Sequence, residues 1–249
     1  MPNYADLTYW ENKYIEQKES PFDWHEDFES LRGIFNDLLK HFQTENLLSS
    51  VNFNFTPNVL VLGCGNSELS ENLLKEMNFK NIFNIDFSSH VIRSMKEKVP
   101  ALCWEVMDVK DLKFNNSYFD LVIDKATMDS LLCGDNSSLN AAMMLREVQK
   151  VLKTGGIYML VSCGEPDMRM VHLMREHLSF EISVQCLKKV YFLEQEGQEV
   201  MQEKMHYVYL CKKKSGADAK SSENFQKVYF ELQREDIIEE EEDNPQFEN

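Results

Sequence analysis

The stretch NVLVLGCGNS, residues 58–67, decides how this chain folds. Four consecutive apolar residues, Val59–Leu62, are typical of a strand buried on both faces of a parallel sheet. Gly63 and Gly65 then allow a tight turn, and the polar residues that end the stretch can cap a following helix. A strand, a glycine turn and a helix N-terminus together predict a site where the backbone approaches a nucleotide-like ligand.

The residue after this stretch narrows the choice of ligand. Dinucleotide-binding folds carry a third glycine at the position of Glu68, where it admits a pyrophosphate. An acidic residue there would repel a pyrophosphate. We therefore expect a ligand with ribose and adenine but no phosphate, of which S-adenosylmethionine is the obvious example.

Three acidic residues, Asp86, Asp108 and Asp124, lie at or just past the ends of predicted strands. These strands are Asn81–Ile85, Ala101–Val106 and Tyr118–Ile123. Because parallel strands end at one edge of a sheet, the three carboxylates should join the glycine turn. Asp86 can accept hydrogen bonds from both ribose hydroxyls, and Asp108 can accept one from the adenine amine. Alternatively, Asp86 caps a helix together with Ser88 or Ser89, and Asp108 is a turn residue.

The order of the elements predicts an α/β fold with a Rossmann-like sheet. A helix at Leu139–Leu152, closed by glycines 155 and 156, precedes a fifth strand at Ile157–Ser162. Two last strands, Phe180–Val184 and His206–Cys211, have no predicted helix between them, only a polar segment. We therefore expect a seven-stranded, mostly parallel sheet over residues 58–214, with an antiparallel C-terminal hairpin and helices on both faces.

Residues 1–57 are predicted to form a helical lid belonging to the same domain. Trp10 and Tyr14 are four residues apart and share one face of a helix, and Trp24 follows the break at Pro21. These rings could close over a ligand, or they could staple an N-terminal helix to the domain. An amphipathic helix at Glu26–His41 and a polar connection at 43–56 should follow.

Composition limits the partners. The chain has 249 residues, a formal net charge of −16, and six cysteines without a C-x-x-C pair. This charge disfavours nucleic acid and favours a basic protein or a small molecule. Scattered cysteines and the lack of a signal peptide predict a cytoplasmic, non-membrane protein without a structural metal, and a monomer is favoured. Residues 215–249 carry 11 acidic and 3 basic side chains and are expected to be a mainly disordered tail, with a short element possible at Phe225–Leu232.

Several of these motifs resemble one known family. LGCGNS at 62–67, DFS at 86–88, MDV at 107–109 and DKATMD at 124–129 resemble class I, seven-strand S-adenosylmethionine-dependent methyltransferases. Together with the N-terminal aromatic residues, they resemble the branch of the elongation factor 1-alpha lysine methyltransferases and the methyltransferase-like 13 relatives. The resemblance covers about residues 5–165, and Ala126 departs from it where relatives usually carry glycine.

The resemblance implies a role for each matching residue. Trp10, Tyr14 and Trp24 would contact the cofactor, Gly63 would lie at its methionine end, and Gly65 would also bind it. Asp86 and Phe87 would contact the ribose, Asp108 and Val109 the adenine, and Lys125 would form part of the pocket wall. It also implies a basic protein substrate such as a translation elongation factor.

A lysine acceptor must be neutral before it can attack a methyl group. From a reference pKa near 10.4, this costs roughly 4.6 kcal/mol at pH 7. We expect Asp124 or Asp129 to take the proton, or Asp124 only to order its loop. Methyltransferases of this fold that act on planar amines usually carry an Asn/Asp-Pro-Pro-Tyr/Phe string after the fourth strand. The segment after Asp124 has no proline, so the resemblance disfavours planar-amine substrates. A small-molecule methyltransferase and a non-catalytic cofactor-binding scaffold remain as alternatives.

Overall fold

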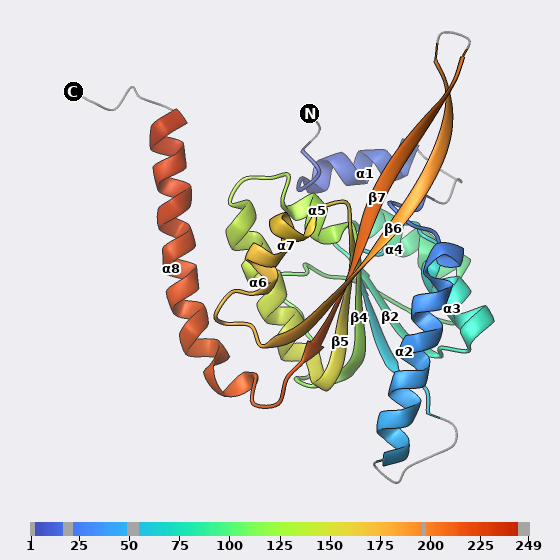
Figure 1. Ribbon diagram of the computed structural model, residues 1–249, viewed down its shortest axis with the longest axis horizontal. Helices are drawn as coiled ribbons and strands as arrows, with labels where there is room; N and C mark the ends of the chain where they lie inside the picture. Colours follow the sequence, from blue (N-terminus) through green and yellow to red (C-terminus); the bar gives the residue numbers. More distant parts are fainter. Residues whose placement is uncertain (1–2, 17–21, 49–54, 196–197, 244–249) are drawn as a thin grey trace.

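The computed structural model describes residues 3–16, 22–48, 55–195 and 198–243, and within them seven strands form one sheet (Figure 1). The strands are β1 (Asn58–Leu62), β2 (Asn81–Asp86), β3 (Cys103–Val106), β4 (Phe119–Lys125), β5 (Leu152–Ser162), β6 (Phe180–Gln195) and β7 (Gln198–Lys213). The helices are α1 (Leu7–Glu16), α2 (Phe28–Leu48), α3 (Leu69–Met77), α4 (Ser89–Lys98), α5 (Thr127–Leu131), α6 (Ser137–Val151), α7 (Pro166–Leu173) and α8 (Asp218–Asp243).

The strand order is β3-β2-β1-β4-β5-β7-β6. Strands β1 to β5 pair in parallel, and β7 pairs antiparallel with both β5 and β6. The order therefore reverses between β1 and β4, which is where ligands bind in open α/β sheets. This topology confirms the predicted fold class, including the antiparallel pair at the edge.

Alternate residues of β1 enter two different cores. Val59 and Val61 pack with residues of α2, α3 and α4, whereas Leu60 and Leu62 pack with residues of α5 and α6. All four are buried, as the uninterrupted apolar run predicts. Helices accordingly cover both faces of the sheet (Figure 1).

The junction between α6 and β5 differs from the prediction. The helix ends at Val151 and β5 begins at Leu152 in extended conformation, so the glycines at 155 and 156 lie inside the strand. Lys213 of β7 supplies the reason: its buried Nζ donates to the carbonyl oxygens of Gln149 and Leu152 at 2.7 and 2.8 Å. A residue distant in sequence therefore satisfies carbonyls that a glycine cap would otherwise satisfy.

The C-terminal hairpin is much longer than predicted. Strands β6 and β7 pair continuously from Phe180↔Lys213 to Gln195↔Gln198. We expected a polar loop between two short strands, but in the described residues that polar segment belongs to the strands themselves. Only Tyr207–Lys212 of β7 also pairs with β5, so the outer half of the hairpin extends beyond the sheet (Figure 1). Gly197, in the predicted connection, lies outside the described residues. Continuous backbone pairing holds the two strands together even where the side chains are polar.

The acidic tail forms a helix over Asp218–Asp243, so the prediction that most of residues 215–249 are disordered is wrong for this segment. Phe225, Val228 and Leu232 lie three and four residues apart and pack against Leu139 and Ala142 of α6. Figure 1 shows α8 standing beside α6, on the outside of the molecule. The apolar stripe thus holds an otherwise charged helix in place.

The predicted N-terminal lid divides into two parts. Helix α2 runs to Leu48, past the expected end at His41, and buries Leu31, Phe35 and Leu38 against the sheet. It therefore belongs to the core, whereas Tyr4, α1 and residues 22–27 lie over the strand ends. Among the described residues, every helix is too short or too polar to cross a membrane.

Candidate active site

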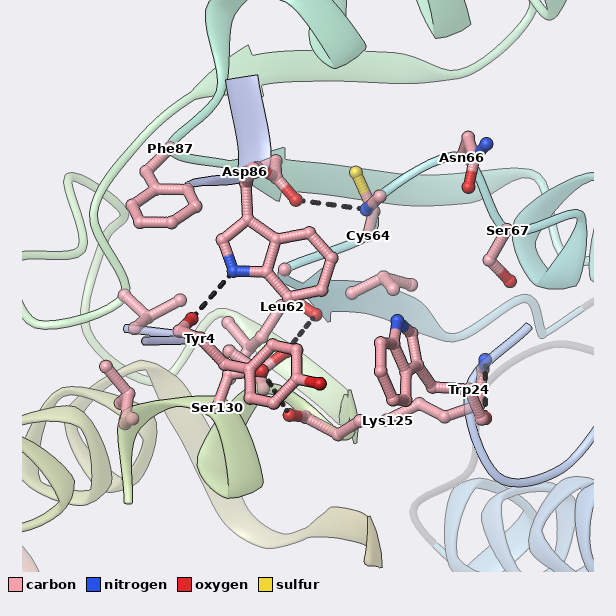
Figure 2. A pocket seen from close by; sticks show the side chains of 18 of the residues that line it. Tyr4, Trp24, Leu62, Cys64, Asn66, Ser67, Asp86, Phe87, Lys125 and Ser130 are labelled. Carbon is pink, nitrogen blue, oxygen red and sulfur yellow. Dashed lines mark hydrogen bonds between the residues drawn. The ribbon is translucent and has the colours of Figure 1, made fainter. Parts of the chain in front are cut away.

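A pocket lies at the carboxyl ends of the central strands, under α1 and the segment that follows it (Figure 2). All ten residues predicted to bind the cofactor line this one pocket. They are Trp10, Tyr14, Trp24, Gly63, Gly65, Asp86, Phe87, Asp108, Val109 and Lys125. The sequence separates them by as much as 115 residues, counted from Trp10 to Lys125, and the topology of the sheet brings them together.

The floor of the pocket is the glycine turn after β1. Gly63 and Gly65 have φ angles of +50° and +51°, which residues other than glycine rarely adopt. A Cβ atom on Gly65 would also lie 2.9 Å from the Tyr14 hydroxyl. The turn therefore needs glycine for its conformation and for the close approach of α1.

Glu68 does not line the pocket, which corrects one step of the sequence argument. It is the N-cap residue of α3, and its carboxylate pairs with Lys98 at 2.9 Å. Its charge is thus directed toward α4 and does not itself exclude a phosphate. The Ser67 hydroxyl accepts a hydrogen bond from the Leu69 amide at the start of this helix.

Asp86 occupies the end of β2 and is buried. One carboxylate oxygen accepts a hydrogen bond from the Gly65 amide at 3.0 Å, and the other from the Ser88 amide at 2.9 Å. Burial raises the pKa of Asp86 to about 6, despite these two hydrogen bonds. Ser88, rather than Asp86, caps α4 by accepting a hydrogen bond from the Val91 amide. The side chain of Asp86 is therefore fixed at the pocket wall and keeps lone pairs for a ligand.

Asp108 and Val109 form the pocket wall beyond β3. The Asp108 carboxylate accepts a hydrogen bond from the Lys110 amide at 2.9 Å, so it orders its own turn as the alternative interpretation predicts. Its side chain is 53% exposed, and it also faces the pocket. Val109 is buried and contributes an apolar surface next to it.

Aromatic rings cover the pocket and form what we call the aromatic lid (Tyr4, Trp10, Tyr14, Phe22 and Trp24). The indole of Trp10 donates to the Tyr4 carbonyl at 2.7 Å, stacks on Tyr14 at 5.7 Å and meets Trp24 edge-on at 6.0 Å. Trp10 thus packs α1 against the rest of the domain and also lines the pocket. It therefore fits both predicted roles, the staple of an N-terminal helix and part of a lid over a ligand. Tyr4 and Phe22 were not predicted as site residues, although their place in an aromatic-rich segment is a usable signal.

Lys125 connects the aromatic lid to the sheet. Its Nζ donates to the Asp23 carboxylate at 2.8 Å and to the Trp24 carbonyl at 3.1 Å. Figure 2 shows Lys125 reaching toward Trp24. Burial lowers the pKa of Lys125, and the charge of Asp23 opposes this shift. The next residue, Ala126, has a φ of +71°, a conformation that favours glycine.

Asp124, one of the two predicted catalytic residues, does not line the pocket. It is fully buried and accepts hydrogen bonds from the backbone amides of Thr127 and Met128 and from the Tyr158 hydroxyl. Burial raises the pKa of Asp124 to about 7. These contacts favour the alternative role, in which Asp124 orders the turn between β4 and α5.

Asp129, the other predicted catalytic residue, lies beside a second hollow. This hollow lies between the segment Phe22–Asp27 and the strands β6 and β7, and it shares Phe22 and Trp24 with the first pocket. Asp129 bonds to His25 at 2.7 Å and to Arg169 at 2.9 Å. Burial opposes ionisation of Asp129, but hydrogen bonds from His25 and Ser162 and the charge of Arg169 hold its pKa below the usual range.

His25, Asp129 and Cys163 place one potential metal-ligand atom each within 4.8 Å of one another. Two features oppose a cation here. Burial raises the pKa of the Cys163 thiol to about 11, and the Arg169 guanidinium already pairs with Asp129. The sequence analysis predicted no metal, and we assign none to this cluster.

The parallel sheet, the glycine turn, the carboxylate at the end of β2 and the aromatic lid define a class I S-adenosylmethionine-dependent methyltransferase. The chain belongs to the methyltransferase domain family, whose model matches residues 56–233. It is 30% identical over 191 residues to EEF1A lysine methyltransferase 4 of Mus musculus, covering 72% of this chain and 69% of that protein. It is 31% identical over 168 residues to the eEF1A lysine and N-terminal methyltransferase of Homo sapiens, covering 65% of this chain and 22% of that protein.

A solved structure shares the fold. It concerns the conversion of a disulfide bond into a thioacetal group during echinomycin biosynthesis, and it matches with a TM-score of 0.51 at 14% identity. The match covers 66% of this chain and 78% of the other. At this identity the likeness shows the fold alone.

Proposed function

We propose that this chain transfers a methyl group from S-adenosylmethionine to a lysine side chain of a basic protein in the cytoplasm. The first candidate substrate is elongation factor 1-alpha, because the names of the relatives state this substrate for them. The observation that carries the proposal is that all ten residues expected to bind the cofactor, which are far apart in the sequence, line one pocket.

The residues present suit a nucleoside ligand. Asp86 is fixed by two backbone amides and can accept from ribose hydroxyls, with Phe87 packed beside it. Asp108 and Val109 suit the adenine edge and face, and the glycine turn suits the methionine end. When bound, the cofactor supplies a methyl group on a positively charged sulfur. The rings of the aromatic lid would exclude water from the bound cofactor.

The acceptor approaches from the second hollow. Trp24 lies at the boundary between the two hollows, so an acceptor beside it would face the methionine end of the cofactor. The enzyme then mainly positions the two reactants in line, because displacement at a methyl carbon needs little covalent help. The net charge of −16 of the whole chain favours the approach of a basic protein.

A labelling experiment tests the proposal. The purified chain is incubated with methyl-labelled S-adenosylmethionine and purified elongation factor 1-alpha, and the product is mapped by mass spectrometry. We expect label on a lysine, a strong loss of labelling with Trp24→Ala, and full labelling with the matched aromatic control Phe230→Ala, whose ring is 57% exposed on α8. Label that enters only small molecules of a lysate would contradict a protein substrate, and no binding of S-adenosylhomocysteine would contradict the cofactor site.

A further inference from the structure

The second hollow contains a histidine that nothing in the sequence motifs singled out. His25 lies between Trp24, which reaches the cofactor pocket, and His206 of β7, and it lines the second hollow. Its backbone has a φ of +64°, in the left-handed region. Strained backbone of this kind persists where the surrounding contacts over-determine it, and it is concentrated at functional sites.

Asp129 fixes the ring of His25 in one orientation. The Nε2 atom of His25 lies 2.7 Å from a carboxylate oxygen of Asp129, and the two side chains are only 10% and 12% exposed. An ionised carboxylate can only accept, so Nε2 carries the hydrogen, and in the neutral imidazole Nδ1 carries the lone pair. This is the arrangement in which a carboxylate prepares a histidine to take a proton.

Asp129 itself is not free to act as the base. Its other oxygen accepts from Arg169 and from the Ser162 hydroxyl, and the Cys163 amide donates to the oxygen that contacts His25. All of its contacts therefore favour a permanently ionised, stationary carboxylate. The proton acceptor beside this hollow must be a neighbouring group.

A second histidine–carboxylate pair lies against the first. The ring of His206 is 4.8 Å from the ring of His25, and its Nδ1 lies 2.7 Å from Glu26. Titratable and charged groups surround the two histidine rings from each element packed against them. They are Asp23, Glu26 and Asp27 of the loop before α2, Lys125 of β4, Asp129 of α5, Cys163 after β5, Arg169 of α7, Lys189 of β6, and Lys204 and His206 of β7.

We infer that His25 accepts the proton that the acceptor lysine must lose, and that Asp129 is the positioning residue for His25. The inference rests on the proposed function, because it concerns the same acceptor. It assigns to His25 the task that the sequence analysis gave to Asp124 or Asp129. It also explains why Asp129 is held so firmly at this place although it does not line the cofactor pocket.

The proton and electron balance is complete without another reactant. The lysine ammonium gives its proton to Nδ1 of His25, and the imidazolium that forms is paired with Asp129. The lone pair of the neutral amine then forms a bond to the methyl carbon while the carbon–sulfur bond breaks and its electrons remain on sulfur. The products are a methylated ammonium and a neutral thioether, and His25 returns its proton to water.

The decisive variant is His25→Asn, because asparagine tolerates the left-handed backbone and cannot act as a base. We expect kcat at pH 7 to fall about 10²- to 10⁴-fold, the usual size of a general-base contribution. The KM for the protein substrate and the Kd for S-adenosylhomocysteine should stay within about threefold. The pH profile of kcat should also differ between the unmodified chain and the variant, because the variant lacks the proton acceptor.

A second variant tests the base directly. His25→Gly also tolerates the φ of +64° and leaves space for imidazole, which should restore part of the activity in proportion to its unprotonated form. The matched control, His90→Gln on α4, lies outside both hollows and should behave like the unmodified chain. An unchanged pH profile in His25→Asn, or no effect of imidazole on His25→Gly while S-adenosylhomocysteine still binds, would overturn the assignment of His25. If the unmodified chain methylates no lysine, both this inference and the proposed function fail.

Discussion

Replacing Asp86 by asparagine should weaken cofactor binding while it stabilises the empty protein. Burial raises the pKa of Asp86 from 3.8 to about 6, a shift of about 2.2 units. At 1.36 kcal/mol per unit, keeping this carboxylate ionised at neutral pH costs about 3 kcal/mol of folding free energy. Asparagine removes the buried charge but replaces one of the two accepting oxygens by an NH2 group that faces a backbone amide, so the ligand-free variant should gain less than about 3 kcal/mol of stability at pH 7.5.

The sign of the pH dependence follows from the same shift. A carboxyl whose folded pKa is raised contributes its stability below its unfolded pKa and loses it as the pH rises through about 6. The difference in stability between Asp86→Asn and the unmodified chain should therefore be small near pH 4 and reach its full size above pH 7. Urea unfolding of the ligand-free proteins at both pH values measures it.

Binding should change in the opposite direction. Hydrogen bonds to a charged acceptor contribute about 1.5–3 kcal/mol, so loss of the carboxylate should weaken S-adenosylhomocysteine binding about 10- to 150-fold in calorimetry. Asp37→Asn, whose side chain is 76% exposed on α2, is the matched control and should change neither quantity by more than about 0.5 kcal/mol. If Asp86→Asn bound the ligand normally, or lost stability and affinity together at every pH, our reasoning about this carboxylate would be refuted.

Three further predictions concern other parts of the molecule. Asp124→Asn should keep the pH profile of kcat, and loss of the acidic or alkaline limb of that profile would show that Asp124 takes part in catalysis. Because the pKa of Asp124 is raised to about 7, the stability of this variant relative to the unmodified chain should increase from pH 4 to pH 8. Leu232→Ala should cost about 2–5 kcal/mol in thermal unfolding while Phe230→Ala costs little, since Leu232 is 1% exposed; equal effects would mean that α8 does not pack on α6. Gly65→Ala should lose at least about 1–2 kcal/mol of stability through its φ of +51° and should also weaken ligand binding by displacing Tyr14; binding at full strength would show that the turn tolerates a side chain.

The sequence predicted most correctly where a local rule has one solution. An unbroken apolar run followed by glycines can only be a buried strand and a turn, and Val59–Leu62 and Gly63 are found in these conformations. Acidic residues at the ends of neighbouring parallel strands lie at one edge of the sheet, which brings Asp86 and Asp108 to the pocket, whereas Asp124, also at a strand end, does not line it. The class of fold and the cofactor pocket follow from these local patterns and from the periodicity of the segments between them.

Contacts between distant residues decided the rest. Lys213 reaches the end of α6 from the last strand, so the helix needs no glycine cap, and the paired strands β6 and β7 support each other well beyond the apolar segments that predicted them. Likewise, the sequence does not distinguish the roles of Asp124 and Asp129. Asp124 is enclosed by backbone amides and the Tyr158 hydroxyl, whereas Asp129 contacts His25, which is 104 positions away in the chain. Local sequence records propensity and periodicity, whereas the surroundings of a buried charge depend on which distant elements pack against it, and only the tertiary structure supplies that information.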